Sequence, residues 1–323
     1  MKDRHVVILL ASYQGAAHIG AQLDSIAVQT HRDWSLIVSD DGSTDGTRDI
    51  VRDFAARFPS GRVALVDGPR KGATPNFLSL LARAPEGAAL AFSDQDDLWL
   101  PGKLSRALDV VSGAQPAHYA ARTIITDENL CPLTGSRLFH RPFGLRNALV
   151  QALMAGNTSV FNPAAARLLK EGAAAAEAAQ IPAHDWWAYQ LMAAAGARLV
   201  HDPQPALLYR QHPRSEVGRN DTLGALALRA RRLAQGEFGD WMASNLDALA
   251  GAEHLLTKEG RDLLHAVRPL IDMSGAEAVR LILKTGLYRQ TRAGTAALLS
   301  AAAAGRLRAR RLPQASRPPE GGR

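Results

Sequence analysis

The sequence predicts an α/β protein in which helices cover a mostly parallel sheet. Short apolar runs alternate with amphipathic stretches through the first half of the chain, and a polar cluster follows most of the apolar runs. This alternation is typical of strands joined by crossover helices. Apolar residues make up 46 % of the chain and charged residues 21 %, which is ordinary for a globular protein.

The first half contains four runs of strand length, and helical patterns separate them. We expect strands at 5–11, 34–39, 62–66 and 88–92. Apolar residues recur every three or four positions in the intervening segments, which predicts helices at 17–29, 45–58 and 74–84. One more helix is expected over 101–112, with Pro101 in its first turn, where a missing N–H costs nothing.

The second half is less regular up to about residue 160 and then becomes clear again. Short strands are expected at 121–127 and 156–161, and two closing strands at 197–202 and 206–212. Asn162 and Pro163 have the residue types of a helix cap and first helical position, which predicts a helix over 162–170. A second helix over 184–196 is expected to end at Gly196.

Three parts are predicted from the change of pattern along the chain. Residues 1–220 form the α/β domain, and residues 221–311, rich in Ala, Leu and Arg, form a helical C-terminal extension. The segment 312–323 is expected to be a disordered basic tail, since it is too polar to fold alone.

The positive charge of the chain lies at its C-terminal end. Residues 276–323 contain ten Lys or Arg and two Glu, a net charge of +8 in a chain of net charge +7, so the remainder is close to neutral. Nucleic-acid binding by the main domain is therefore not expected. The basic C-terminus is either a packed helix with a solvated tail or a peripheral contact with an anionic membrane.

The remaining compositional features predict a cytoplasmic location, with the inner face of the cytoplasmic membrane as a peripheral site. The single Cys131 cannot form an internal disulfide, as is usual in a reducing compartment. The N-terminal run HVVILLASY is too short for a secretory signal. No segment reaches the ~18–20 uninterrupted apolar residues of a spanning helix.

Polar clusters after the predicted strands indicate a ligand site at one edge of the sheet, where ligands of open α/β sheets bind. The clusters are Ser12–Tyr13, SDDGSTDGT at 39–47 and SDQDD at 93–97. Three carboxylates in SDQDD (Asp94, Asp96, Asp97) favour a hard cation, Mg²⁺ or Mn²⁺, that bridges protein oxygens to phosphate groups. The alternatives are a solvated acidic surface, an ordinary capped loop at 39–47 and a packed aromatic at Tyr13.

Three ordered motifs resemble the family 2 glycosyltransferases of the GT-A fold. They are VVILLASYQG, LIVSDDGSTDGT and AFSDQDDLWLPGKL, and the resemblance extends over about residues 4–215. It is strongest to the bacterial surface-polysaccharide branch, which includes many rhamnosyltransferases, because HDWW and YRQH follow in the same order.

The resemblance implies a role for each matching position. Ala11, Ser12 and Tyr13 match the first nucleotide-contact loop, Asp41 the carboxylate that bonds the pyrimidine base, and Asp94 the carboxylate that faces the ribose.

The remaining matches concern the metal and the acceptor. Asp96 matches the metal ligand, and His212 matches a position that reaches the metal or the diphosphate in some relatives. Without the resemblance, His212 is equally well explained as a hydrogen-bonded histidine at a strand end. Asp185 matches the catalytic base. His184 stands where many relatives have a Glu. Without the resemblance, Asp185 is equally well explained as a helix cap or first-turn acid. Trp186 and Trp187 are expected to provide one core and one acceptor-side aromatic.

The implied activity is inverting, metal-dependent transfer of a sugar from a nucleotide-sugar donor to a glycan or lipid-linked acceptor in cell-surface polysaccharide synthesis. The donor is a dTDP- or UDP-sugar, with dTDP-rhamnose favoured by the branch. The motif of processive synthases is absent, so polymer synthesis by that route is not expected. The alternatives are a nucleotidyltransferase, although ASYQGAAH lacks a basic phosphate loop, and a non-catalytic nucleotide-sugar-binding protein.

Overall fold

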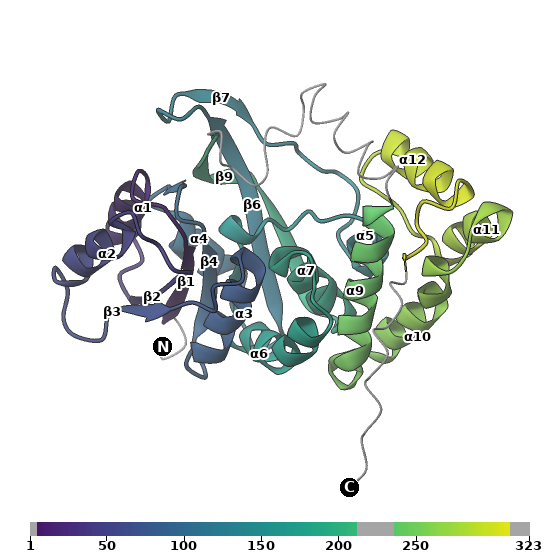
Figure 1. Cartoon of the computed structure of the whole chain (residues 1–323), viewed down its shortest axis with the longest axis horizontal. Coiled ribbons are helices and arrows are strands. Elements are labelled where there is room, and N and C mark those ends of the chain that lie inside the picture. The colour runs from purple at the N-terminus through teal and green to yellow at the C-terminus, as the bar shows by residue number, and fades with distance from the viewer. Residues whose placement is uncertain (1–4, 212–235, 311–323) are drawn as a thin grey trace, which may run out of the picture.

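The computed structural model describes residues 5–211 and 236–310, which build a nine-stranded sheet with helices on both faces (Figure 1). The strand order is β3-β2-β1-β4-β8-β6-β9-β5, and β7 pairs with β6 outside this path. The first four strands of this order are parallel, whereas β8 runs antiparallel to both of its neighbours. The strands are β1 Val6–Ser12, β2 Trp34–Asp40, β3 Val63–Asp67, β4 Ala89–Ser93, β5 Leu98–Trp99, β6 Ala117–Thr126, β7 Pro132–Gly135, β8 Val160–Phe161 and β9 Arg198–Arg210.

Alternate side chains of β1 are apolar on both faces of the sheet, so helices must cover both faces. Val7 and Leu9 point into one core, with α3, α6 and α7, while Ile8 and Leu10 point into the other, with α1, α2 and α4. A strand that is buried on both faces reads as a continuous apolar run, as VVILLA does. The helices of this part are α1 Ile19–Ala27, α2 Thr47–Ala55, α3 Ala73–Arg83, α4 Lys103–Val110, α5 Leu145–Ala148, α6 Pro163–Ala178 and α7 His184–Ala194.

The structure confirms the predicted strands and helices of the first half; α1 and α2 are shorter than expected, and α3 has the expected length. It also confirms the Asn162 cap, whose side chain accepts from Ala165 N–H, and extends that helix to Ala178. Gly196 has φ +72° and follows α7, as a terminating glycine should.

Four expectations about element bounds were wrong. Pro101 precedes the cap Gly102 instead of lying in the first helical turn. The strand expected at 121–127 begins earlier, at Ala117, because its first residues pair with β8 and β9. The segment 156–161 is a short 3-10 turn, Gly156–Thr158, followed by the two residues of β8. Instead of the two expected closing strands there is one strand, β9. Its pairing with β6 is irregular near its prolines, so the strand continues past them.

The C-terminal helices lie together beside α6 and α7, at the end of the molecule away from β3 (Figure 1). They are α9 Glu237–Gly251, α10 Lys258–Val267, α11 Gly275–Thr285 and α12 Arg292–Ala303. Met242 and Leu246 of α9 share one apolar core with Leu169 of α6 and Leu191 of α7. The predicted boundary near 220 and the predicted tail 312–323 lie outside the described residues. No helix in the described ranges has the length and apolar character that crossing a membrane requires.

Candidate functional site

The predicted donor loops meet at the carboxyl ends of β1, β2 and β4. Ser12 ends β1, and its hydroxyl donates to the Asp40 carboxylate at 3.0 Å, while its carbonyl accepts from the Asp41 N–H at 2.8 Å. Ala11 pairs with Ser39 of β2, one residue before these contacts. The first two members of the expected nucleotide-contact loop are therefore fixed to the strand that carries Asp41.

The two carboxylates of the Asp pair have different environments. Asp40 is buried and also accepts from Ser43 and Arg48. Burial alone would raise the pKa of Asp40, but the hydrogen bonds from Ser43, Ser12 and Arg48 outweigh it and hold the pKa below its ordinary value. Asp40 is thus an ionised structural group of the loop.

Asp41 joins this loop to the segment after β3. Its Oδ1 accepts from the Arg70 N–H at 2.6 Å and its Oδ2 from the Gly72 N–H at 2.8 Å. A Cβ at Gly68 would stand 2.8 Å from Asp41 Oδ1, so the chain passes closely around the carboxylate. Each carboxylate oxygen retains a lone pair, so Asp41 can accept from a ligand in addition.

Tyr13 presents an exposed ring on a backbone that is held in place. Its side chain is 56 % exposed, whereas its N–H donates to Gln95 Oε1 at 3.0 Å and its carbonyl accepts from Gln95 Nε2 at 2.9 Å. Gln95 stands between Asp94 and Asp96, so one amide side chain connects the loop after β1 to the acidic segment after β4.

The acidic segment itself is half-buried at Asp94 and Asp96, and residues at the end of β9 close it from one side. Arg210 Nε donates to the Asp96 carbonyl at 3.0 Å. Burial, followed by the charges of the neighbouring Asp94, Asp97 and Asp96, raises the pKa of Tyr209 above its ordinary value. The phenol of Tyr209 therefore faces the carboxylates as a neutral hydrogen-bonding group.

Within the described ranges, no three His, Cys, Asp or Glu side chains gather in an arrangement that could ligate a metal. Asp94 and Asp96 are two carboxylates on one short loop, and a cation held there would need further oxygens from a bound diphosphate. His212, the third expected contact, lies outside the described residues.

Asp185 lies in the first turn of α7, and each oxygen of its carboxylate accepts one backbone hydrogen bond. Its Oδ2 accepts from the Gly156 N–H at 3.2 Å and its Oδ1 from the Trp186 N–H at 2.7 Å. The positive end of the helix favours a negative charge at this position.

Neighbouring aromatic residues fix the start of α7. The ring of His184 stacks on Phe77 with centroids 3.8 Å apart, and burial lowers the pKa of His184 to about 4. Trp186 and Trp187 are both buried, so the expectation that one of them is an acceptor-side aromatic was wrong. Trp186 instead donates to the Ala148 carbonyl and stacks on Phe238 of α9.

Three residues at this edge were not predicted: Gln95, Tyr209 and Asn157. Gln95 and Tyr209 stand inside the quoted motifs, but only the three-dimensional structure shows that Gln95 joins two loops and that the charges of the acidic segment act on Tyr209. Asn157 lies in the run GNTSVF, where nothing in the sequence singles it out. Its side chain donates to Asp97 at 2.7 Å.

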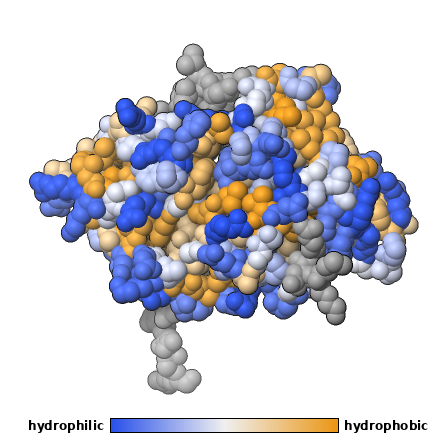
Figure 2. Space-filling view, turned by 180° about the vertical axis from the view of Figure 1, so that it is seen from behind, coloured by the Kyte–Doolittle hydropathy of each residue, from blue (hydrophilic) through white to orange (hydrophobic). Residues whose placement is uncertain are grey.

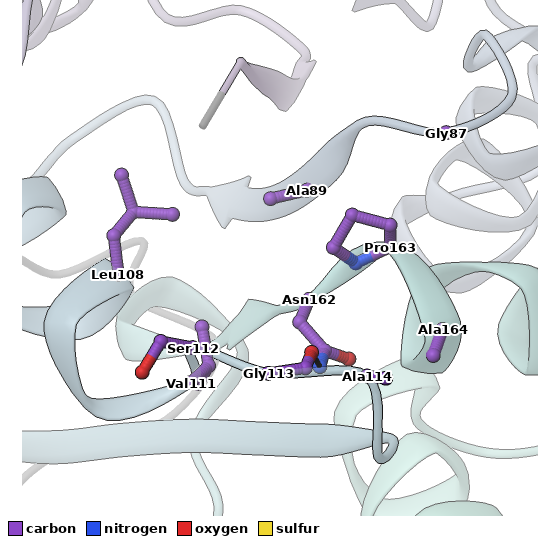
Figure 3. A pocket seen from close by; sticks show the side chains of 10 residues that line it. All are labelled: Gly87, Ala89, Leu108, Val111, Ser112, Gly113, Ala114, Asn162, Pro163 and Ala164. Atoms are coloured by element: carbon purple, nitrogen blue, oxygen red, sulfur yellow. Dashed lines mark hydrogen bonds between the residues drawn. The ribbon is translucent and has the colours of Figure 1, made fainter. Parts of the chain in front are cut away.

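A cavity of about 550 Å³ lies at the opposite end of the sheet, between the end of α4, the start of β4 and the start of α6 (Figure 3). Its lining is mostly apolar, with Leu108, Ala89 and Pro163 around it. The amide nitrogen of Asn162, its main polar group, already donates to the carbonyls of Gly113 and Gln115. No titratable residue lines the cavity, and we assign no chemistry to it.

Comparison with solved structures shows the fold. The mannosyltransferase PcManGT from Pyrobaculum calidifontis, solved in complex with GDP-Man and Mn²⁺, superposes with a TM-score of 0.51 at 21 % identity. The superposition covers 95 % of this chain and 88 % of that one. The sheet and helices described above are therefore those of a GT-A glycosyltransferase.

Comparison of sequences identifies the family. The dTDP-rhamnosyl transferase RfbG of Shigella flexneri is 28 % identical over 229 residues, covering 65 % of this chain and 74 % of that protein. The UDP-Glc:alpha-D-GlcNAc-diphosphoundecaprenol beta-1,3-glucosyltransferase WfgD of Escherichia coli is 30 % identical over 111 residues, or 34 % of this chain and 42 % of that protein. Residues 7–166 match the domain of glycosyl transferase family 2. The domain that contains residues 7–166 is therefore a glycosyltransferase domain of family 2.

Proposed function

We propose that this glycosyltransferase transfers a sugar, with inversion at the anomeric carbon, from a nucleotide sugar to a glycan or lipid-linked acceptor of cell-surface polysaccharide synthesis. The favoured donor is dTDP-rhamnose, with a UDP-sugar as the rival. The names of the relatives support this: one is a dTDP-rhamnosyl transferase, and another acts on a diphosphoundecaprenol-linked sugar.

One observation supports the proposal most strongly: a continuous series of contacts joins the donor loops to Asp185. Gln95 binds the backbone of Tyr13, and Asp97, two residues further on, accepts from Asn157. Gly156, the residue before Asn157, donates to Asp185. A carboxylate next to a donor site is the group that the reaction requires.

Asp185 is proposed to act as the general base. The acceptor hydroxyl is a weak nucleophile, and a positioned carboxylate that takes its proton typically contributes 10²–10⁴-fold to the rate. The hydrogen bonds from Gly156 and Trp186 orient the carboxylate and leave each of its oxygens a lone pair for the acceptor. Attack from the side opposite the leaving diphosphate inverts the anomeric centre.

A divalent cation, Mg²⁺ or Mn²⁺, is proposed as the cofactor. Asp94 and Asp96 are hard oxygen donors on one half-buried loop, which fits Mg²⁺ or Mn²⁺ bound by one or two carboxylates and by substrate phosphates. We propose His212 as a further contact. Such a cation, when bound, would offset the charge that develops on the diphosphate leaving group.

A peripheral contact with an anionic membrane through the basic C-terminus is proposed as well. Arg306 and Arg308 are exposed after α12, whereas Arg310 is bound to Asp240 of α9. A large hydrophobic side chain, Leu283 of α11, is also exposed at this end of the fold. The hydrophobic area at the upper right edge of the rear face (Figure 2) is not part of this surface, because the view is turned by 180° from Figure 1 and that edge lies on the side of β7, away from α12.

The membrane contact is tested by co-sedimentation with vesicles that contain anionic lipid. Each basic residue near such a surface contributes about 1 kcal/mol. An Arg306→Ala, Arg308→Ala double variant should therefore bind roughly tenfold or more weakly, whereas Arg52→Ala on α2 should bind like the wild type. Equal binding by all three proteins would remove the support for this contact.

The proposed reaction is tested by turnover with a panel of dTDP- and UDP-sugars and a diphosphate-linked lipid acceptor. The product is analysed by NMR for its anomeric configuration. Inversion with one donor supports the proposal. Retention of the anomeric configuration would contradict direct attack by the acceptor from the side opposite the diphosphate. Release of pyrophosphate from a nucleoside triphosphate would favour a nucleotidyltransferase. Nucleotide-sugar binding without any transfer would favour a binding protein.

A further inference from the structure

The third carboxylate of SDQDD has an environment unlike that of the other two. Asp97 has no exposed surface, whereas Asp94 and Asp96 are half-buried. Its Oδ2 accepts from Asn157 Nδ2 at 2.7 Å, across 60 residues of sequence. Asp97 is thus turned into the protein, toward the segment before β8.

Lys103 approaches the same asparagine from the first turn of α4. It is buried, and its Nζ donates to the Asn157 carbonyl at 2.7 Å while lying 3.2 Å from the centre of the Trp99 ring. Asn157 is therefore held at its side chain by a carboxylate and at its backbone by an amine. Both come from the acidic motif and the residues that follow it.

The turn that contains Asn157 also contains the partner of the proposed base. Gly156 donates its N–H to Asp185 Oδ2 at 3.2 Å. A Cβ at Gly156 would stand 2.8 Å from His184 Nε2 and 3.2 Å from Asp185 Cβ, so the turn packs directly against the start of α7. A shift of Asn157 would consequently move the group that orients the base.

We propose that Asp97 and Lys103 are positioning residues, which hold the Gly156–Thr158 turn so that it orients the Asp185 carboxylate. In this assignment Asp97 is not a ligand of the cation. The inference rests on the proposed function in taking Asp185 as the base. It means that the donor segment and the base are parts of one hydrogen-bonded unit.

The test separates positioning from donor binding. In Asn157→Ala and Asp97→Ala, kcat is expected to fall about 10–100-fold, since a misplacement of about 1 Å costs on the order of 10². The donor Kd, measured by calorimetry, is expected to stay within about twofold, because neither side chain is assigned to the donor site. Asp97→Asn retains an oxygen that can accept from Asn157 and should recover most of the lost kcat.

Asn162→Ala is the matched control. Asn162 is also a buried asparagine that bonds backbone groups, but it lies at the other end of β8. This variant should lose stability and keep kcat within about threefold. If Asn157→Ala does not fold, Asn157→Ser replaces it, because serine is small and polar but too short to reach Asp97.

Three outcomes would overturn the inference. The first is a kcat in Asn157→Ala and Asp97→Ala equal to that of Asn162→Ala. The second is a cation concentration for half-activation that rises tenfold in both Asp97→Ala and Asp97→Asn, which would make Asp97 a ligand. The third is a wild-type kcat in Asp185→Asn, which would remove the base; this result, unlike the first two, refutes the proposed role of Asp185, whereas the absence of any sugar transfer by the wild type would refute the proposed function itself.

Discussion

At the scale of single residues, neighbouring side chains of the same type have different tasks. Asp40 and Asp41 are adjacent, yet the first is enclosed by Ser12 and Ser43 and the second reaches the segment after β3. The sequence predicts that acids gather here, but which acid is buried depends on partners far along the chain. Spacing alone therefore cannot separate a structural acid from a binding one.

Asp185→Asn is the direct test of the base. The amide keeps the size of the side chain and loses the ability to take a proton. We expect kcat to fall by about 10²–10⁴-fold, the usual contribution of a general base. The donor Kd, measured by calorimetry, should not change. A loss of less than threefold in kcat would leave Asp185 as a first-turn acid that stabilises α7.

Gln95→Ala tests the connection between the loop after β1 and the acidic segment. The substitution removes two hydrogen bonds to the backbone of Tyr13. Each contributes about 0.5–1.5 kcal/mol. We expect the donor Kd to rise by about 3–30-fold and the free energy of unfolding to fall by about 1–3 kcal/mol. Gln204→Ala, which removes an amide bonded to the half-buried Arg106, is the control and should leave the donor Kd unchanged.

At the scale of elements, the first half of the fold is predictable and the second half much less so. Strands buried on both faces are apolar throughout, so the runs VVILLA and AALAF can be recognised as strands from the sequence alone. By contrast, β9 contains Pro203 and Pro205, which suggested two strands, and only the pairing with β6 shows that the strand continues past them. Local pattern cannot supply a pairing partner that is some eighty residues away.

The packing of α10 on α7 can be tested by a substitution at their contact. A Cβ at Gly260 would stand 2.2 Å from the Ala194 carbonyl oxygen, a backbone atom that cannot easily move. Alanine inside a helix gains about 1 kcal/mol in propensity, but overpacking costs about 1–3 kcal/mol. Because the clash is with backbone, we expect Gly260→Ala to lower the free energy of unfolding by about 2 kcal/mol in urea titrations.

Gly102→Ala is the matched control for this prediction, since nothing lies within 4 Å of a Cβ at Gly102. Its free energy of unfolding should stay within about 1 kcal/mol of the wild type, since alanine is only a poorer helix cap than glycine. If Gly260→Ala is as stable as this control, α10 does not pack on α7 as described.

At the scale of the whole molecule, the C-terminal helices complete the core of the glycosyltransferase domain. Phe238 of α9 stacks on Trp186, the residue that follows the proposed base. The Ala- and Leu-rich pattern predicts that these residues are helical. It does not predict that they pack on α6 and α7, because several helical partners would bury the same apolar face.

Stability of the whole chain should fall in acid, in part because of buried histidines. Burial lowers the pKa of His118 to about 3, while an unfolded histidine titrates near 6.5. Between these values the unfolded state binds more protons, so stability is lost as the pH falls below 6.5. At pH 5 the titration of His118 lowers the free energy of unfolding by about 2 kcal/mol.

His118→Gln should therefore lose less stability between pH 7 and pH 5 than the wild type does, whatever its stability at pH 7. Urea titrations at the two pH values measure this difference. An equal loss in both proteins would show that His118 is protonated in the folded state.

The central claim is that the loops after β1, β2 and β4 form a metal-dependent nucleotide-sugar site. Calorimetric titration of dTDP-sugars, UDP-sugars and their nucleoside diphosphates, with Mn²⁺, with Mg²⁺ and with a chelator, tests it most directly. We predict that one nucleotide binds the wild type only with a cation, and that Asp96→Ala weakens this binding at least tenfold. If no nucleotide binds at millimolar concentration, or if Asp96→Ala binds like the wild type, the claim is contradicted.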